Sequence, residues 1–116
     1  MQSQVEWPDE LDALIAAPEH HFLLFENEFV RVLDTTLPPG ETVPLHTHRW
    51  PGTLYVISFS HFVRRNRAGE VVIDSRTTGG AAPGSAQWAA PRPPHTLENV
   101  GESVFRGISV EVKKFV

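Results

Sequence analysis

The pattern of apolar and polar positions along the chain changes near residue 20. Before that point, Leu11, Leu14 and Ile15 recur at helical spacing and form an apolar stripe. This spacing predicts a short helix over 8–17, which Pro18 ends. Beyond it, short apolar or alternating runs are separated by glycine and proline, a pattern typical of β-strands joined by turns. The sequence therefore predicts a mainly β protein with one short N-terminal helix.

The predicted strands follow one another at intervals of about ten residues. If the strand over 53–59 is regular, one of its faces carries Thr53, Tyr55, Ile57 and Phe59. In the last strand, the even-numbered positions from Val104 to Val112 carry apolar side chains and share one face, which Arg106 interrupts. Roughly eight such strands make an antiparallel sandwich or a small barrel.

Length and composition narrow the class of protein. The chain of 116 residues is the size of one domain, which we expect to consist of an N-terminal helical extension over 1–20 and a single β-barrel over 21–116. The net charge of -4, without a basic cluster, argues against nucleic-acid binding. There is no cysteine, no apolar run long enough to span a membrane and no signal-peptide pattern at the N-terminus. We therefore expect a cytoplasmic protein.

Two histidines, His46 and His48, are the strongest chemical signal in the chain. On a strand they point to the same face, with Cα atoms roughly 6.6 Å apart. Both imidazoles can therefore bind one divalent ion. A third histidine, His95, follows a proline-rich corner and precedes Asn99 by four residues. These three histidines predict a joint metal site, and the alternative is a set of polar strand residues around a metal-free pocket.

Other polar residues have weaker signals. Tyr55 has the parity of Thr53 and could donate its hydroxyl into a pocket, or it could be a core tyrosine. Arg92 could bind a substrate carboxylate at the pocket mouth, or it could be solvated. The remaining histidines lack partners at ligand spacing and are assigned structural roles: His20, His21 and His61.

Two segments of the chain resemble the two sequence motifs of the cupin superfamily, and the resemblance extends over about 25–112. The matching residues are Gly40, His46 and His48 in the first segment and Gly84, His95 and Asn99 in the second. The resemblance implies a jelly-roll β-barrel, the double-stranded β-helix, with a metal inside it. The stretch starting at Phe25 is also similar to small single-domain bacterial cupins named for β-alanine degradation.

One departure from the motif concerns the metal. The glutamate that usually completes the first motif falls at Thr53 or at Gly52, and neither can supply a carboxylate. Three neutral imidazoles leave the full +2 charge on a metal, which would attract anions. If Thr53 occupies the vacated position, its side chain faces the metal. The arrangement resembles the three-histidine iron site of cupins that oxygenate small thiols.

The resemblance favours an enzyme that uses one divalent transition metal (Fe, Zn, Ni or Mn) and acts on a small polar or anionic metabolite. The chemistry would be dioxygenase-like or isomerase-like. The alternatives are a non-catalytic module that binds a small ligand or a metal, and a vestigial structural dimer. We also expect a homodimer, because the apolar segment 22–25 and the C-terminal segment are candidates for a covered sheet edge. Metal affinity should fall as the pH drops through about 6.5.

Overall fold

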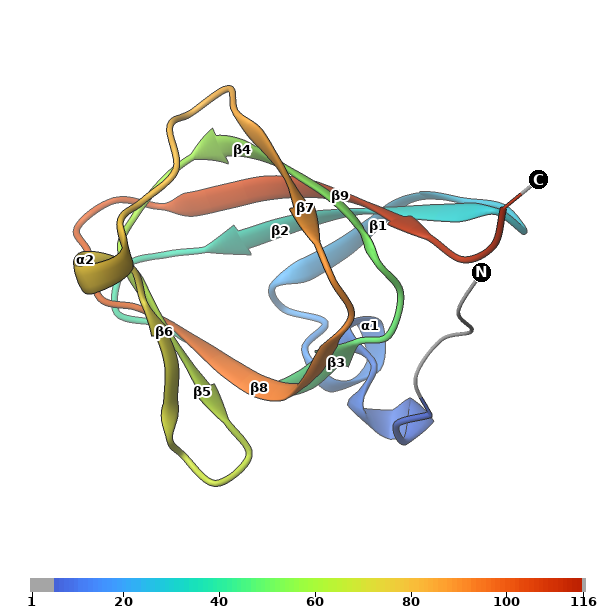
Figure 1. The fold of residues 1–116 in the computed structure, drawn as a ribbon, viewed down its shortest axis with the longest axis horizontal. Coiled ribbons are helices and arrows are strands. Elements are labelled where there is room, and N and C mark those ends of the chain that lie inside the picture. The colour runs from blue at the N-terminus through green and yellow to red at the C-terminus, as the bar shows by residue number, and fades with distance from the viewer. Residues whose placement is uncertain (1–5, 116) are drawn as a thin grey trace.

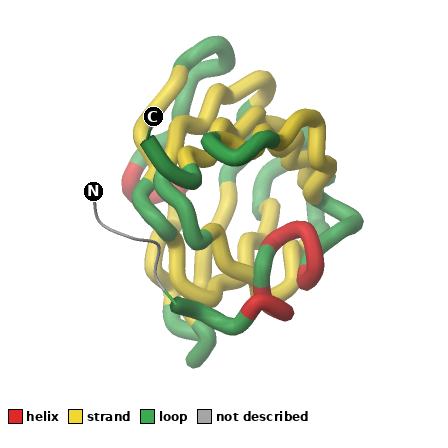
Figure 2. Tube along the Cα trace, turned by 90° about the vertical axis from the view of Figure 1, so that its right-hand side faces the viewer, coloured by secondary structure: helices red, strands yellow, loops and turns green. Residues whose placement is uncertain are grey.

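The computed structural model describes residues 6–115 and contains two antiparallel sheets packed face to face (Figure 1). In spatial order, the five-stranded sheet contains β1 (His21–Glu26), β2 (Val30–Leu37), β9 (Phe105–Val112), β4 (Gly52–Ser58) and β7 (Ala86–Ala89). The four-stranded sheet contains β3 (Thr42–His48), β8 (Arg92–Asn99), β5 (Phe62–Asn66) and β6 (Val71–Asp74). Figure 2 shows loops and short helical segments around these layers of strands. The prediction of an antiparallel β fold is confirmed.

The short N-terminal helix is also present, but it is divided in two: η1 (Asp9–Leu11) and α1 (Ala13–Ala16). Asp12 separates the two segments because its backbone is extended, with ψ 141°, and its carboxylate accepts a hydrogen bond from Leu14 N. The predicted apolar stripe is not the buried face. Ala13 and Ala17 are buried, whereas Ile15 is 61% exposed. A second short helix, α2 (Ser75–Thr78), follows β6.

The predicted parity of β4 is wrong by one residue. Leu54 and Val56 line the internal cavity, whereas Thr53, Tyr55 and Ile57 are exposed on the outer face. The strand is apolar on both faces, so hydrophobicity alone does not mark the side that faces the core. Phe59 does reach the cavity, because the β4–β9 register shifts between Val56 and Ser58.

The same ambiguity affects β9. The buried positions are the odd-numbered ones, Phe105, Gly107, Ser109 and Glu111. The apolar side chains at even-numbered positions, such as Ile108 and Val110, lie on the outer face and are only half-buried. The interior of this barrel is therefore partly polar, and the outer face of the five-stranded sheet is unusually apolar. Buried polar groups inside the barrel need hydrogen-bond partners there.

The apolar core lies where the two sheets converge. Its buried members are Ala17, Leu37, Val43 and Phe105, and they pack against Leu54, Phe59, Phe62 and Leu97. Phe59, Phe62 and Phe105 form a ring cluster with edge-to-face contacts and centroid distances of 5.9–6.3 Å. None of the helices in residues 6–115 has the length and apolar character that a bilayer crossing requires.

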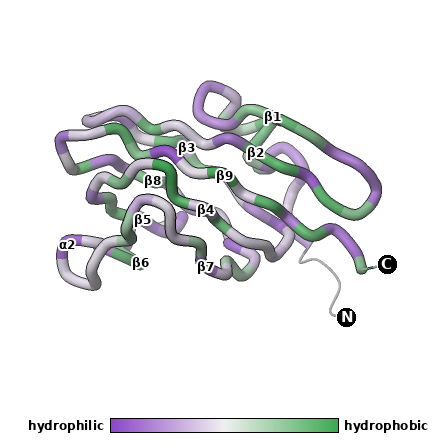
Figure 3. The backbone as a smooth tube through the Cα atoms, turned by 90° about the horizontal axis from the view of Figure 1, so that it is seen from above, coloured by the Kyte–Doolittle hydropathy of each residue, from purple (hydrophilic) through white to green (hydrophobic). Residues whose placement is uncertain are grey.

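The apolar outer face suggests self-association, and we propose that a second copy of the chain covers it. Phe22 and Phe25 of β1, Tyr55 of β4 and Trp88 of β7 are each about half exposed or more, and Figure 3 shows hydrophobic colour along β1. Light scattering at micromolar concentration should give twice the 13.0 kDa mass of one chain. Phe25→Glu should yield monomers with an unchanged circular dichroism spectrum. A monomeric wild type would refute the proposal.

Candidate metal centre

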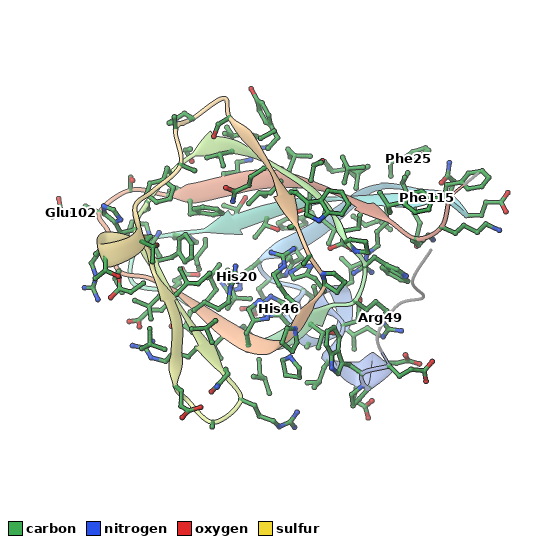
Figure 4. All side chains as sticks on the ribbon, in the orientation of Figure 1. His20, Phe25, His46, Arg49, Glu102 and Phe115 are labelled. Atoms are coloured by element: carbon green, nitrogen blue, oxygen red, sulfur yellow. The ribbon has the colours of Figure 1, made fainter. Side chains whose placement is uncertain are left out.

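Four buried histidine rings from three strands meet between the two sheets. His21 begins β1, His46 and His48 end β3, and His95 lies within β8. The ring centroids are 4.3 Å apart for His46–His95, 5.0 Å for His46–His48 and 5.0 Å for His21–His46. We call these four residues the histidine cluster, and Figure 4 labels one of them, His46, whose side chain lies between the two sheets.

The pairing of β3 with β8 brings His46 and His48 next to His95. His46 lies directly opposite His95, and a register irregularity then places His48 opposite Arg92. The three histidines singled out in the sequence, at positions 46, 48 and 95, therefore share one side of the four-stranded sheet. His46 and His48 keep the two-residue spacing that directs both rings inward.

His21 is the member of the cluster that sequence reasoning missed. One ligand nitrogen from each of His21, His46 and His48 lies within 4.8 Å of the others, a spacing compatible with one metal ion. His95 stands slightly outside this tightest group, although its ring is the nearest neighbour of His46. The structural role assigned to His21 is therefore corrected. Its direction is set by the register of β1 with β2, where His21 pairs with Thr35, another residue that lines the cavity.

Every ring of the cluster is oriented in the same way, through its Nδ1 atom. Nδ1 donates to Pro44 O in His46 and to Pro93 O in His95, at 2.7 Å in both. In His21 it donates to Ala17 O at 3.0 Å. Because a carbonyl oxygen can only accept, the proton must lie on Nδ1. Nε2 of each of these rings is left with a free lone pair, the form in which imidazole binds a metal.

His48 is oriented by a carboxylate, which a chain of buried charges holds in place. Its Nδ1 donates to Glu111 Oε2 at 2.7 Å, while Glu111 Oε1 accepts from Arg31 Nε at 2.6 Å. The Arg31 guanidinium also donates two hydrogen bonds to Asp12, at 2.8 and 3.0 Å. A carboxylate behind a histidine fixes the tautomer and raises the basicity of the metal-binding nitrogen. The Glu111 carboxylate thus acts on the centre through His48.

The missing glutamate of the first motif has a steric explanation. Of the two positions considered for it, Thr53 is exposed on the outer face, so it cannot face a metal in the cluster. Gly52 has the inward parity, but a Cβ atom there would overlap the backbone of Val110 on β9. No side chain fits at this point. Gly52 pairs instead with Glu111, and the carboxylate reaches the centre from β9.

Burial keeps the cluster neutral. Loss of hydration is the main cause that lowers the pKa of His46 to about 2 and that of His95 to about 3, and neighbouring histidines lower both further. The pKa of His48 is well below its usual value, and that of His21 is lowered, also mainly by burial. The rings of the cluster therefore stay neutral well below pH 6.5. We now expect metal affinity to persist below that pH, instead of falling there as the sequence alone suggests. Four neutral imidazole nitrogens fit a divalent transition metal.

The cluster opens into a cavity of about 520 Å³. Arg92, the predicted carboxylate-binding residue, lines this cavity, and so does Arg64. Tyr55 does not, because the parity of β4 turns it to the outer face, where it is 48% exposed. The hypothesis that Tyr55 donates into the pocket is therefore corrected.

Comparison with known proteins identifies the fold. No protein-family model and no curated protein sequence matches the chain. Among solved structures, it is similar to a cupin domain from Bordetella pertussis, with a TM-score of 0.67 and 17% identity over 81% of this chain and 92% of that chain. An RmlC-like cupin from Methanocaldococcus jannaschii gives a TM-score of 0.55 and 14% identity, over 97% and 90% of the two chains.

A third similar structure is an enzyme, the DMSP lyase DddQ from Ruegeria pomeroyi. It gives a TM-score of 0.55 and 12% identity, over 82% of this chain and 48% of that chain. Similarities at such low identity show a shared fold and nothing further about chemistry. The chain therefore has the double-stranded β-helix fold of cupin proteins.

Proposed function

We propose that the protein binds one divalent transition metal at the histidine cluster and acts there on a small polar or anionic metabolite. The observation that carries the proposal is the common orientation of the rings, whose Nδ1 atoms are held by the protein while Nε2 stays free. Fixed, neutral imidazoles are suited to zinc, iron and nickel, and manganese is a further candidate. When bound, such an ion would supply Lewis-acid chemistry or, in the case of iron, oxygenase chemistry.

The residues of the chain have separable roles in this proposal. The backbone carbonyls of Ala17, Pro44 and Pro93 and the carboxylate of Glu111 orient the rings. The cavity beside them has room for a small metabolite, and apolar side chains form much of its wall. Arg92, opposite His48, places a positive charge beside the cluster.

Elemental analysis of protein purified without a histidine tag tests metal binding. The proposal expects one transition-metal ion per chain, and at least a tenfold loss of affinity in His46→Ala, the ring in contact with the other three. His61→Asn is the matched control, because His61 contacts Ser75 and not the cluster. Equal metal content in His46→Ala and wild type would contradict the proposal.

A non-catalytic metal-binding module is the second candidate, and the presence of a fourth histidine favours it. Four protein ligands can complete the coordination of a metal, whereas catalysis needs a position open to substrate. Azide added to the cobalt-substituted protein distinguishes the two candidates. A change in the visible spectrum shows an open position and supports an enzyme, whereas an unchanged spectrum supports the binding module. A fold neighbour that is a lyase shows that the fold can carry catalysis.

A further inference from the structure

Two arginine side chains enter the cavity without a carboxylate partner. Arg64 of β5 and Arg92 of β8 both line it. The Nε atom of each is buried and has no hydrogen-bond partner. Among residues 6–115, neither guanidinium takes part in a salt bridge, although most other arginines do. Both positive charges therefore lie at the cavity wall without a salt-bridge partner.

The lining of the cavity itself supplies no carboxylate, although the charge of Glu111, behind His48, acts on Arg92. Of the described residues that line it, none is an aspartate or a glutamate. Much of the wall is apolar: Leu54, Val56, Phe59, Phe62, Leu97 and Phe105. Both arginine side chains are half-buried, and taking a charged group even partly out of water without a partner is unfavourable. A site that retains two such cations beside an apolar wall is therefore suited to an anion that carries an apolar part.

The two arginines and the histidine cluster line the same cavity. Arg92 lies opposite His48 in the β3–β8 ladder, and Arg64 lies opposite Leu97 in the β5–β8 ladder. Burial, and then the charge of Arg64, lower the pKa of Arg92 to about 10, so Arg92 stays charged at neutral pH. The charges of both arginines also help to lower the pKa of His95, after its burial. A molecule bound in this cavity would therefore lie close to both the arginines and the histidine cluster.

We propose that Arg64 and Arg92 form a binding subsite for the carboxylate of a small organic acid, whose apolar part packs against the aromatic and aliphatic wall. Planar guanidinium groups match the two oxygens of a carboxylate and form strong charge-assisted hydrogen bonds with them. The apolar wall selects an organic acid over an inorganic anion. This inference deepens the proposed function, on which it rests, by naming the substrate class of the same cavity.

The experiment uses metal-free protein, so that it does not depend on metal binding. Propionate is titrated into ¹⁵N-arginine-labelled protein at pH 7 in chloride-free buffer, and propionamide, which has the same shape without the charge, is titrated in parallel. Propionate should shift the Nε–H signals of Arg64 and Arg92. The signal of Arg65, which neighbours Arg64 and pairs with Glu98 at 2.8 Å, should not move. Propionamide should leave all three signals in place.

Variants give the second measurement. Arg64→Met and Arg92→Met should each weaken propionate binding about tenfold or more, and Arg65→Met should leave it unchanged within about twofold. Removing an unpaired, half-buried charge should keep or raise the melting temperature of Arg92→Met, whereas a purely structural arginine would lower it. The inference would be overturned if propionamide bound as tightly as propionate. It would also be overturned if propionate left the Nε–H signals of Arg64 and Arg92 in the wild type unchanged. If propionate binds but zinc does not, the subsite stands and the proposed metal function fails.

Discussion

Between pH 6.5 and pH 4 we expect the metal-free protein to lose most of its free energy of unfolding. His46, His48 and His95 are neutral in the folded state because burial lowers their pKa values. In the unfolded chain each binds a proton near its ordinary pKa of about 6.5. Below pH 6.5 the unfolded state therefore holds more protons than the folded state, so stability falls as the pH falls.

The size of this effect follows from the number of histidines involved. Each contributes up to about 1.4 kcal/mol per pH unit below pH 6.5. Three together are enough to exhaust the roughly 5–15 kcal/mol of a typical domain by about pH 4. Urea unfolding at pH 7, 6, 5 and 4.5 measures the slope, with His61→Gln as a control that should keep the wild-type slope. An unfolding free energy that stays constant from pH 7 to pH 5 would show that the cluster is solvated.

Replacing Arg31 should be the most destabilising single change outside the cluster. Arg31→Met removes the cation that lies between Asp12 and Glu111 and leaves two buried carboxylates without their main partner. The expected loss is about 3–5 kcal/mol, the usual consequence of breaking a buried ion pair from one side. Metal affinity should fall by about 10–100-fold as well, because Glu111 would no longer be held against His48.

Urea unfolding and metal titration of the same variant separate the two effects. The matched control is Arg76→Met, because Arg76 pairs with Asp74 on the surface and its side chain is 54% exposed. That variant should behave like the wild type in both measurements. Wild-type stability in Arg31→Met would mean that the buried carboxylates find other partners, and the described chain of charges would then not hold Glu111.

The site residues recognised from the sequence are those whose placement depends on local geometry. His46 and His48 are two residues apart on a strand, so a shared direction follows from the strand itself. Prolines at 44 and 93 precede His46 and His95 by two residues, and their carbonyls orient the rings locally. That repeated Pro-x-His spacing is a signal that the sequence also contains.

The residues missed or misplaced are those whose placement depends on pairing between distant segments. His21 enters the cluster through the register of β1 with β2, and the run of apolar residues after it gives no alternation from which to infer its direction. The direction of Tyr55 does not follow from the sequence, because β4 carries apolar side chains on both faces. The role of Glu111 depends on a contact with His48 across 63 positions of sequence. Periodicity within one strand contains none of this information.

Long-range ¹H–¹⁵N NMR of the histidine rings tests the central claim most directly. At pH 7, the four cluster histidines should each show a proton on Nδ1 and a free Nε2. His20 should differ, because its Nε2 lies 3.0 Å from Glu41 Oε1. One equivalent of zinc should shift Nε2 signals of the cluster and leave those of His20 and His61 in place. Protons on Nε2 of the cluster histidines, or signals that zinc does not move, would contradict a metal centre built from these rings.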